Sequence, residues 1–203
     1  LNLLNVKNKL ENNSYKLEEL CLVAYGVRVN SKHDKSKPKN YYVHNENNSK
    51  YKKFIEGKDI NRYTHCQTAW LNYQPTEHYN AMFPELFENE KLMFINVVSE
   101  RIRFSYDNEF LYNSHTVINC VKIEKLLNAT HISAKRILEK SDIKEVLKYD
   151  LKYILLLLNS NLINWYFLNF LSEGLHFYPD DAKSLPIKIT TQEIQIPFIE
   201  KAE

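Results

Sequence analysis

Glycine is scarce in this sequence: only three of the 203 residues are glycine, and Gly26, Gly57 and Gly174 stand far apart. Loops that cradle a phosphate or a dinucleotide need several glycines within a few residues, because glycine lets the backbone approach the ligand closely. The spacing excludes both the P-loop and the Rossmann fingerprint. A Gly-x-Ser-x-Gly nucleophile elbow is absent as well. We therefore expect no cofactor site and no catalytic residue within this chain.

Cysteine is equally rare, and the three thiols, Cys21, Cys66 and Cys120, are odd in number and far apart. A disulfide framework and a zinc site both need paired spacing. His65 stands beside Cys66, but no second pair of ligands follows, so no metal is expected. The sequence predicts three buried thiols in a reducing cytoplasm. Residues 1–19 mix asparagine, lysine and glutamate with leucine, unlike a secretory signal peptide.

A long uninterrupted hydrophobic run is also missing. Residues 151–171 approach the length of a membrane span, but polar residues interrupt them at Asn159, Ser160, Asn161, Asn164 and Asn169. Apolar residues recur there every three or four positions, which is typical of a helix that packs against a core. Asp150 before the stretch and Gly174 after it suit the helix caps. We expect one long C-terminal apolar helix over 151–171 and no membrane partner.

What the sequence has in abundance is lysine and arginine in one region. The net charge is only +2, but residues 28–62 carry ten cations against four carboxylates. Such a cluster suits contacts with the phosphates of a nucleic acid, which release condensed counterions. A lysine-rich, solvated loop is the competing interpretation, and charge alone does not separate the two.

The remaining pattern predicts strands, short helices and an extended tail. Apolar and alternating runs favour strands at 41–43, 69–73, 92–98, 101–106 and 116–121. Residues 133–148 suit a helix broken at Ser141–Asp142, and residues 184–198 suit extended chain. In the strand at 101–106, Arg101, Arg103 and Ser105 would share a wet face.

The fold class that follows is mixed α/β. We expect a twisted, largely antiparallel β-sheet with packing helices, mainly β over 17–123 and mainly helical over 124–203. Trp70 and Tyr73 are expected in the core.

A metal-dependent nuclease would need clustered carboxylates beside a lysine. Asp107 with Glu109, and Glu88 with Glu90 and Lys91, approach that pattern. Asp107-Asn108 suits a hairpin turn, however, and residues 88–91 suit a solvated loop before a strand. We favour these structural interpretations and keep a free-standing nuclease as an alternative.

An ordered series of motifs resembles a known family. The motifs are LEELCLVAYGV at 17–27, FIEGKDINRY at 54–63, KLMFI at 91–95, LLLLNSNLINWYF at 155–167, and LPI at 185–187 followed by IPFI at 196–199. Together they resemble the TaqI-like C-terminal specificity domain. Residues 123–149 depart from that pattern, because they are longer and more charged.

The resemblance implies that residues 1–203 form a target-recognition domain of a larger protein. That family serves adenine-specific DNA methyltransferases and fused restriction-modification enzymes, so double-stranded DNA and a methyltransferase domain of the same chain are the implied partners. S-adenosylmethionine is expected in that other domain, since this chain lacks the Asn/Asp-Pro-Pro-Tyr/Phe motif that holds a flipped adenine. The fragment itself would catalyse nothing, whereas the parent protein would be the enzyme.

The residues expected to contact DNA come from the basic region and from the strand at 101–106. They are Arg28, Lys52, Lys53, Lys58, Asp59, Arg62, Tyr63, Arg101 and Arg103. The lysines and Arg62 would neutralise phosphates, whereas the other arginines would offer guanine a bidentate fork.

Several of these residues also have a structural interpretation. Arg101 and Arg103 suit surface ion pairs with Glu100 or Glu109, Gly57 suits a turn with positive φ, and Asp59 suits the orientation of Arg62. A second functional hypothesis is a protein–protein interaction or oligomerisation domain without DNA affinity, in which the helix at 151–171 and the aromatic residues form an interface.

Overall fold

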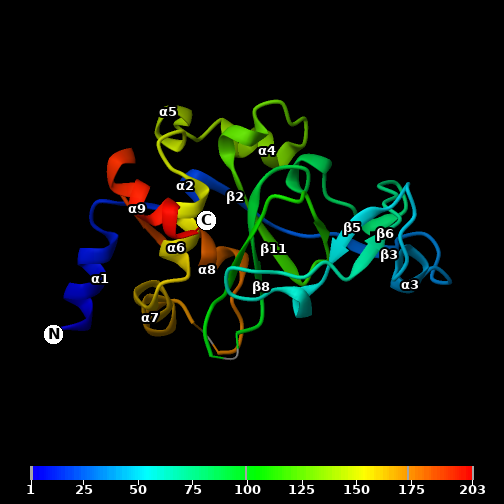
Figure 1. Cartoon of the computed structure of the whole chain (residues 1–203), viewed down its shortest axis with the longest axis horizontal. Coiled ribbons are helices and arrows are strands. Elements are labelled where there is room, and N and C mark those ends of the chain that lie inside the picture. Colours follow the sequence, from blue (N-terminus) through cyan, green and yellow to red (C-terminus); the bar gives the residue numbers. More distant parts are fainter. Residues whose placement is uncertain (1, 99, 173, 203) are drawn as a thin grey trace.

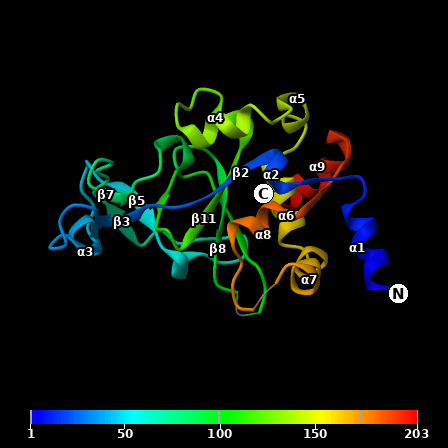
Figure 2. The same cartoon turned by 180° about the vertical axis from the view of Figure 1, so that it is seen from behind.

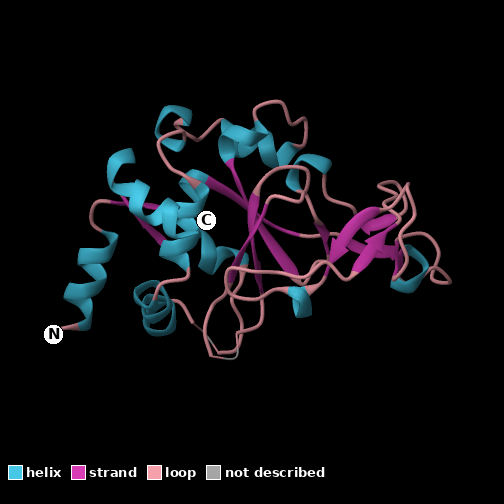
Figure 3. Ribbon diagram, in the orientation of Figure 1, coloured by secondary structure: helices cyan, strands magenta, loops and turns pink. Residues whose placement is uncertain are grey.

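The computed structural model describes residues 2–98, 100–172 and 174–202. Helices gather at one end of an elongated molecule, a four-stranded sheet fills the middle, and a smaller sheet forms the other end (Figure 1, Figure 2). Figure 3 shows the helices mainly at one end and the strands in the middle and at the other end. The expected mixed α/β fold with largely antiparallel strands is confirmed. The division into a β part and a helical part at residue 123 stays a prediction.

The central sheet is built from four largely buried strands. In order across the sheet, these are β2 (Cys21–Tyr25), β11 (Val117–Lys122), β8 (Lys91–Ile95) and β9 (Phe104–Asp107), and all neighbours are antiparallel. Every residue of β11 is buried, as expected for a strand covered on both faces. The strands expected near 92–98 and 116–121 are therefore confirmed.

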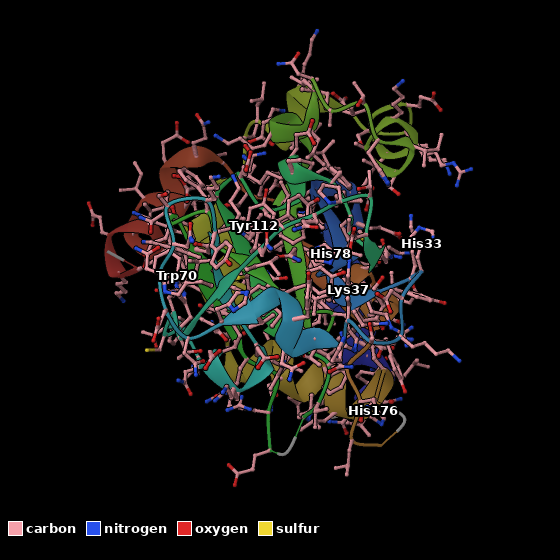
Figure 4. All side chains as sticks on the ribbon, turned by 90° about the vertical axis from the view of Figure 1, so that its right-hand side faces the viewer. His33, Lys37, Trp70, His78, Tyr112 and His176 are labelled. Carbon is pink, nitrogen blue, oxygen red and sulfur yellow. The ribbon has the colours of Figure 1, made fainter. Side chains whose placement is uncertain are left out.

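A second four-stranded sheet and two strand pairs flank the central sheet. The second sheet has the order β10 (Tyr112–Asn113), β5 (Lys52–Ile55), β6 (Ala69–Leu71) and β4 (Val43–His44), and the pairs are β3 (Arg28–Ser31) with β7 (His78–Asn80) and β1 (Ser14–Lys16) with β12 (Pro186–Lys188). Figure 4 looks onto this sheet end, where Trp70, His78 and Tyr112 are labelled.

The helices are short. They are α1 (Leu3–Glu11), α2 (Leu17–Leu20), α3 (Lys39–Tyr42), α4 (Ile132–Leu138), α5 (Ile143–Val146), α6 (Leu151–Leu158), α7 (Asn161–Phe170), α8 (Pro179–Lys183) and α9 (Gln192–Ala202), with 3₁₀ turns η1 (Gly57–Asp59), η2 (Pro84–Leu86) and η3 (Ile123–Leu126). Asp142 caps α5, which confirms the break expected at Ser141–Asp142.

The prediction of one long helix over 151–171 is wrong. Asp150 caps the start as expected, but the chain forms two helices that separate at Asn159 and Ser160. Ser160 begins α7, because its hydroxyl accepts a hydrogen bond from the Ile163 amide at 3.1 Å. The apolar stripe of α6 packs inside the molecule, so it is not free to form an interface with a second protein.

Three other local predictions are corrected. The strand expected at 101–106 begins only at Phe104, and Ser105 is completely buried instead of facing water. Tyr41 and Tyr42 end the helix α3, and only Val43 enters a strand. The tail is extended in β12 but turns helical at Gln192, and Pro197 lies inside α9.

A charged pair is enclosed in the core: Lys91, which was expected in a solvated loop, is the first residue of the buried strand β8, and Asp107 is the last residue of β9. Lys91 and Asp107 are both completely buried and form a short ion pair. The Lys91 ammonium also donates to the Phe87 carbonyl at 2.7 Å, and Asp107 accepts from the amides of Glu109 at 2.8 Å and Leu111 at 3.0 Å. Burial lowers the pKa of Lys91, whereas Asp107 opposes that shift. Both residues therefore serve the fold.

The thiols differ from their prediction at one position. Cys21 and Cys120 are buried, and burial raises the pKa of both, but Cys66 is exposed. Among the residues that the structure describes, no helix combines the length and the apolar character that crossing a membrane requires.

Replacing Lys91 by methionine should destabilise the fold by about 3–5 kcal/mol, because it leaves the buried Asp107 carboxylate without its counter-charge. The double variant Lys91→Met/Asp107→Asn should recover part of that loss, since it removes both charges. Urea unfolding measures the free energy. Lys183→Met is the matched control, because Lys183 pairs with Asp180 at the surface and its loss should change little. An unchanged stability of Lys91→Met would contradict this assignment.

Candidate functional site

Two segments that are far apart in the sequence run side by side and carry six of the predicted site residues, four of them cations. The Tyr63 amide donates to the Phe104 carbonyl at 2.8 Å, and Tyr63 forms a parallel bridge with Ser105. Tyr63 has a φ of 72°, a left-handed conformation that few non-glycine residues adopt. This contact places Lys58 and Arg62 on one segment beside Arg101 and Arg103 on the other.

Asp59 shapes the first of these segments from inside. Its carboxylate accepts hydrogen bonds from the Glu56 amide and the Thr68 hydroxyl, both at 2.8 Å, and the residue is buried. The expectation that Asp59 orients Arg62 is wrong, because Arg62 donates to the Asn159 carbonyl instead. A DNA contact by Asp59 remains a prediction.

Gly57 also differs from its expected role. Of the described glycines only Gly174 has a positive φ, so Gly57 does not provide the left-handed turn. The Gly57 amide donates to the Thr116 hydroxyl at 3.2 Å, and an added Cβ would lie 3.2 Å from the same oxygen. Gly57 therefore allows the segment to approach β11 closely.

Lys58 and Arg103 line one surface hollow of about 480 Å³. Its other polar lining residues are Glu56, Asn61, Asn96 and Thr116. Neither cation has a carboxylate within ion-pair distance in the described ranges 2–98, 100–172 and 174–202, and Glu109, an expected partner of Arg103, binds Lys53. The hollow thus combines these two cations with amide and hydroxyl groups and with the carboxylate of Glu56, which pairs with Lys39.

Arg62 and Arg101 meet at the carboxyl end of α6. Each donates through Nη2 to the Asn159 carbonyl at 2.8 Å, an oxygen that the end of a helix leaves available. Arg101 also reaches the side chain of Asn161, the first residue of α7, at 3.3 Å. Burial, followed by repulsion from Arg62, lowers the pKa of Arg101.

Two asparagines hold the Arg101 segment against the helices. The Asn159 side chain accepts from the Phe104 amide at 2.9 Å and donates to the Phe104 carbonyl at 2.8 Å. The Asn164 side chain accepts from the Ile102 amide at 3.0 Å. These hydrogen bonds keep Arg101 and Arg103 in an extended segment at the protein surface.

Arg28 extends the positive surface toward the second sheet. It is exposed on β3 and stacks on Tyr79, with 4.5 Å between guanidinium and ring centre. Burial lowers the pKa of His115, and the positive charges of Arg28 and Lys39 add to that shift. His115 directly precedes Thr116, which lines the hollow. We call Arg28, Lys58, Arg62, Arg101 and Arg103 the basic track.

Lys52 and Lys53 do not join the basic track as free charges. Lys52 pairs with Glu88 at 2.8 Å, and Lys53 pairs with Glu109 at 2.7 Å. They are consecutive residues of β5, so their side chains leave opposite faces of the strand. Of the four residues expected to neutralise phosphates, only Lys58 and Arg62 belong to the basic track, because Lys52 and Lys53 are neutralised by their carboxylate partners.

Sequence reasoning missed an arrangement that looks like a catalytic triad. The His65 Nδ1 lies 2.8 Å from the Ser105 hydroxyl, and His65 Nε2 lies 3.8 Å from Glu109. Ser105 is completely buried, so its hydroxyl does not meet a substrate. These residues are 40 positions apart, and no local motif marks them. In the described part of the chain, no three His, Cys, Asp or Glu residues converge as metal ligands.

The family model of the TaqI-like C-terminal specificity domain matches residues 52–187. The resemblance inferred from the motifs is thereby confirmed. None of the curated proteins matches the chain.

Two solved structures align with this chain at low sequence identity. The HsdS subunit from Thermoanaerobacter tengcongensis aligns with a TM-score of 0.49 and 11% identity, over 98% of this chain and 41% of that one. A chain from a structure of complex assembly and conformational transition in the type I R-M system aligns with a TM-score of 0.50 and 12% identity, over 98% and 43%. The present chain spans less than half the length of either protein.

Replacing Asn159 by leucine should destabilise the protein by about 1–3 kcal/mol, because the buried Phe104 amide loses its Asn159 acceptor, although the Phe104 carbonyl keeps the Tyr63 amide as a donor. Amide hydrogen exchange should show faster exchange at Phe104. Asn169→Leu is the matched control, since Asn169 is exposed and bonds only within its own helix. Equal effects of the two substitutions would contradict the assigned role of Asn159.

Proposed function

We propose that this chain, which belongs to the family of TaqI-like C-terminal specificity domains, recognises a target site in double-stranded DNA for a restriction-modification system. The observation that carries the proposal is the basic track. Its five cations lie along neighbouring segments, and none has an ion-pair partner among the described residues. Positive charge that no carboxylate neutralises attracts a polyanion such as the DNA backbone.

The chemistry of the hollow suits the reading of base edges. Guanine presents two acceptors to an arginine, and adenine presents a donor and an acceptor to an asparagine amide. Arg103, Asn61 and Asn96 supply these groups from one hollow, with Lys58 beside them. In this proposal phosphate contacts set the register of the domain on the duplex, and the hollow supplies the sequence preference.

For the parent protein we propose an adenine-specific DNA methyltransferase, in which a domain outside this chain binds S-adenosylmethionine and modifies the base. The methyltransferase resides in the same polypeptide, with or without an endonuclease, and the enzyme acts in the cytoplasm. The family match supports this assignment, and so does the absence of a methyl-transfer motif from the sequence of this chain. Tyr63 and Asp59 position the cations of the track in this scheme.

A second candidate assembly places the methyltransferase in a separate subunit. It is favoured by the fold shared with a chain of a type I R-M system over 98% of the present chain. An assay that incubates the purified full-length protein with S-adenosylmethionine and duplex DNA distinguishes the two assemblies. Formation of N6-methyladenine by the protein alone supports the fused enzyme. Methylation that requires an added subunit supports the separate one.

The triple variant Arg28→Gln/Lys58→Gln/Arg103→Gln should bind duplex DNA at least about tenfold more weakly at 0.1 M salt, because each cation that meets a phosphate contributes about 0.9 to the slope of log affinity against log salt. Fluorescence anisotropy with labelled duplexes over a range of salt concentrations measures both quantities.

Two control variants remove similar charge elsewhere. Lys125→Gln/Arg136→Gln/Lys140→Gln changes cations on and beside α4, which lies at the opposite edge of the molecule from α7 (Figure 1). Lys52→Gln/Lys53→Gln removes the two paired lysines. Both controls should retain most of the affinity. A loss as large as that of the track variant would show that net charge, and not the basic track, governs binding.

A further inference from the structure

Arg62 and Arg101 form an unusual pair, because two like charges share one acceptor. Both guanidinium groups donate to the Asn159 carbonyl at 2.8 Å. Repulsion alone would drive the two side chains apart in solvent. The structure instead fixes both of them, so the positive charges are held together before any ligand arrives.

Neutral groups complete the surroundings of the pair. Arg62 donates to the Tyr63 hydroxyl at 3.1 Å and lies over the Tyr63 ring at 4.8 Å, and Arg101 contacts the Asn161 side chain. Neither arginine forms an ion pair within the described residues. The Nε of Arg101 is buried and has no hydrogen-bond partner. Arg62 is exposed and uses only Nη2 in these hydrogen bonds, so the pair has donors to spare and two charges that only an anion would balance.

We propose that Arg62 and Arg101 together hold a single backbone phosphate of the bound DNA at the junction of α6 and α7. This proposal rests on the proposed function and assigns one contact within it. The phosphate carries the negative charge that the pair lacks, and its oxygens accept hydrogen bonds from both guanidinium groups. Asn161 is the first residue of α7 and contacts Arg101, so the start of that helix lies beside the pair.

A base edge is a poorer occupant of this position. Bases are neutral, and a guanine edge satisfies one guanidinium, which would leave the second positive charge unbalanced. The pair is also fixed by backbone and ring contacts, which suits a contact that is the same in every sequence. Lys58 and Arg103 of the other hollow form no side-chain hydrogen bond with the residues that the structure describes, so that hollow is left for sequence-dependent contacts.

The test compares Arg62→Gln, Arg101→Gln and the double variant on short duplexes of several unrelated sequences. One lost phosphate contact lowers the salt slope by about 0.9, which corresponds to about eightfold in affinity at 0.1 M salt. Because the two arginines share one phosphate, the double variant should lose about that amount, equally for every sequence. A loss of twice that slope would mean separate phosphates, and an unchanged slope would mean no contact. Either result overturns the proposal.

Two further measurements separate a lost phosphate contact from other effects of the substitutions. Arg136→Gln on the exposed face of α4 is the matched arginine control and should bind like the unaltered chain. Urea unfolding of each variant shows whether Arg101→Gln has lost its fold. Arg62 is exposed, so Arg62→Gln gives the answer in that case.

A chemical probe identifies the phosphate itself. Duplexes with a single neutral methylphosphonate, moved step by step along the backbone, should weaken binding of the unaltered chain at one position that no longer matters in the double variant. If methylphosphonates at all positions affect both proteins alike, the shared phosphate contact is refuted while DNA recognition stands. If the unaltered chain binds no duplex at all, the proposed function itself fails.

Discussion

The side-chain amide of Asn159 forms two hydrogen bonds with the backbone of Phe104, and the arrangement of the candidate site depends on them. They join the end of α6 to the start of β9, inside the core and away from water. A buried amide that satisfies both a donor and an acceptor fixes the distance and the direction of the segment it binds. Residues 101–103 directly precede Phe104, so the buried contact between Asn159 and Phe104 determines where Arg101 and Arg103 lie.

The same residue explains why the helical region is broken. A continuous helix would use the Asn159 carbonyl for an internal hydrogen bond, and no acceptor would remain for Arg62 and Arg101. The break at Asn159 and Ser160 frees that oxygen and starts α7 beside it. The interruption of the helix thus provides the carbonyl oxygen that holds the two cations.

The distribution of ion pairs decides which cations remain available. Four lysines of the basic region are paired: Lys37 with Glu77, Lys39 with Glu56, Lys52 with Glu88 and Lys53 with Glu109. Exposed pairs of this kind add little stability. Their effect is electrostatic. The glutamates cancel the positive potential of the four lysines around the basic track, so positive potential remains along the track itself. A net charge of +2 conceals this separation.

The parts of the fold and of the candidate site that follow from the sequence are those marked by a local pattern. The apolar runs of β8 and β11 and the cap at Asp150 are local, and they predicted their elements correctly. Asn159-Ser160-Asn161 was interpreted only as polar interruption of an apolar stretch, although Ser before a helical turn is also a start signal. Period-two alternation placed Ser105 in water, but Ser105 is buried, and its hydroxyl lies 2.8 Å from Nδ1 of His65, which follows the Tyr63 segment along the free edge of β9. That contact joins residues about forty positions apart, and no local pattern contains it.

Arg28 shows how a residue outside the matched range 52–187 still joins the track. The chain crosses from β2 to β3 at Gly26, where an added Cβ would lie 2.2 Å from the Asn113 side-chain oxygen and 2.4 Å from the Ser114 carbonyl. Only glycine permits that approach, and the Val27 amide then donates to the Asn113 carbonyl at 2.8 Å. Asn113 is itself held by reciprocal hydrogen bonds with Asn119 of the buried strand β11. The position of Arg28 therefore follows from the central sheet, as that of Arg101 follows from α6. Asn113 at one end of the basic track and Asn159 at the other are both buried, and they connect the cations of the track to the core.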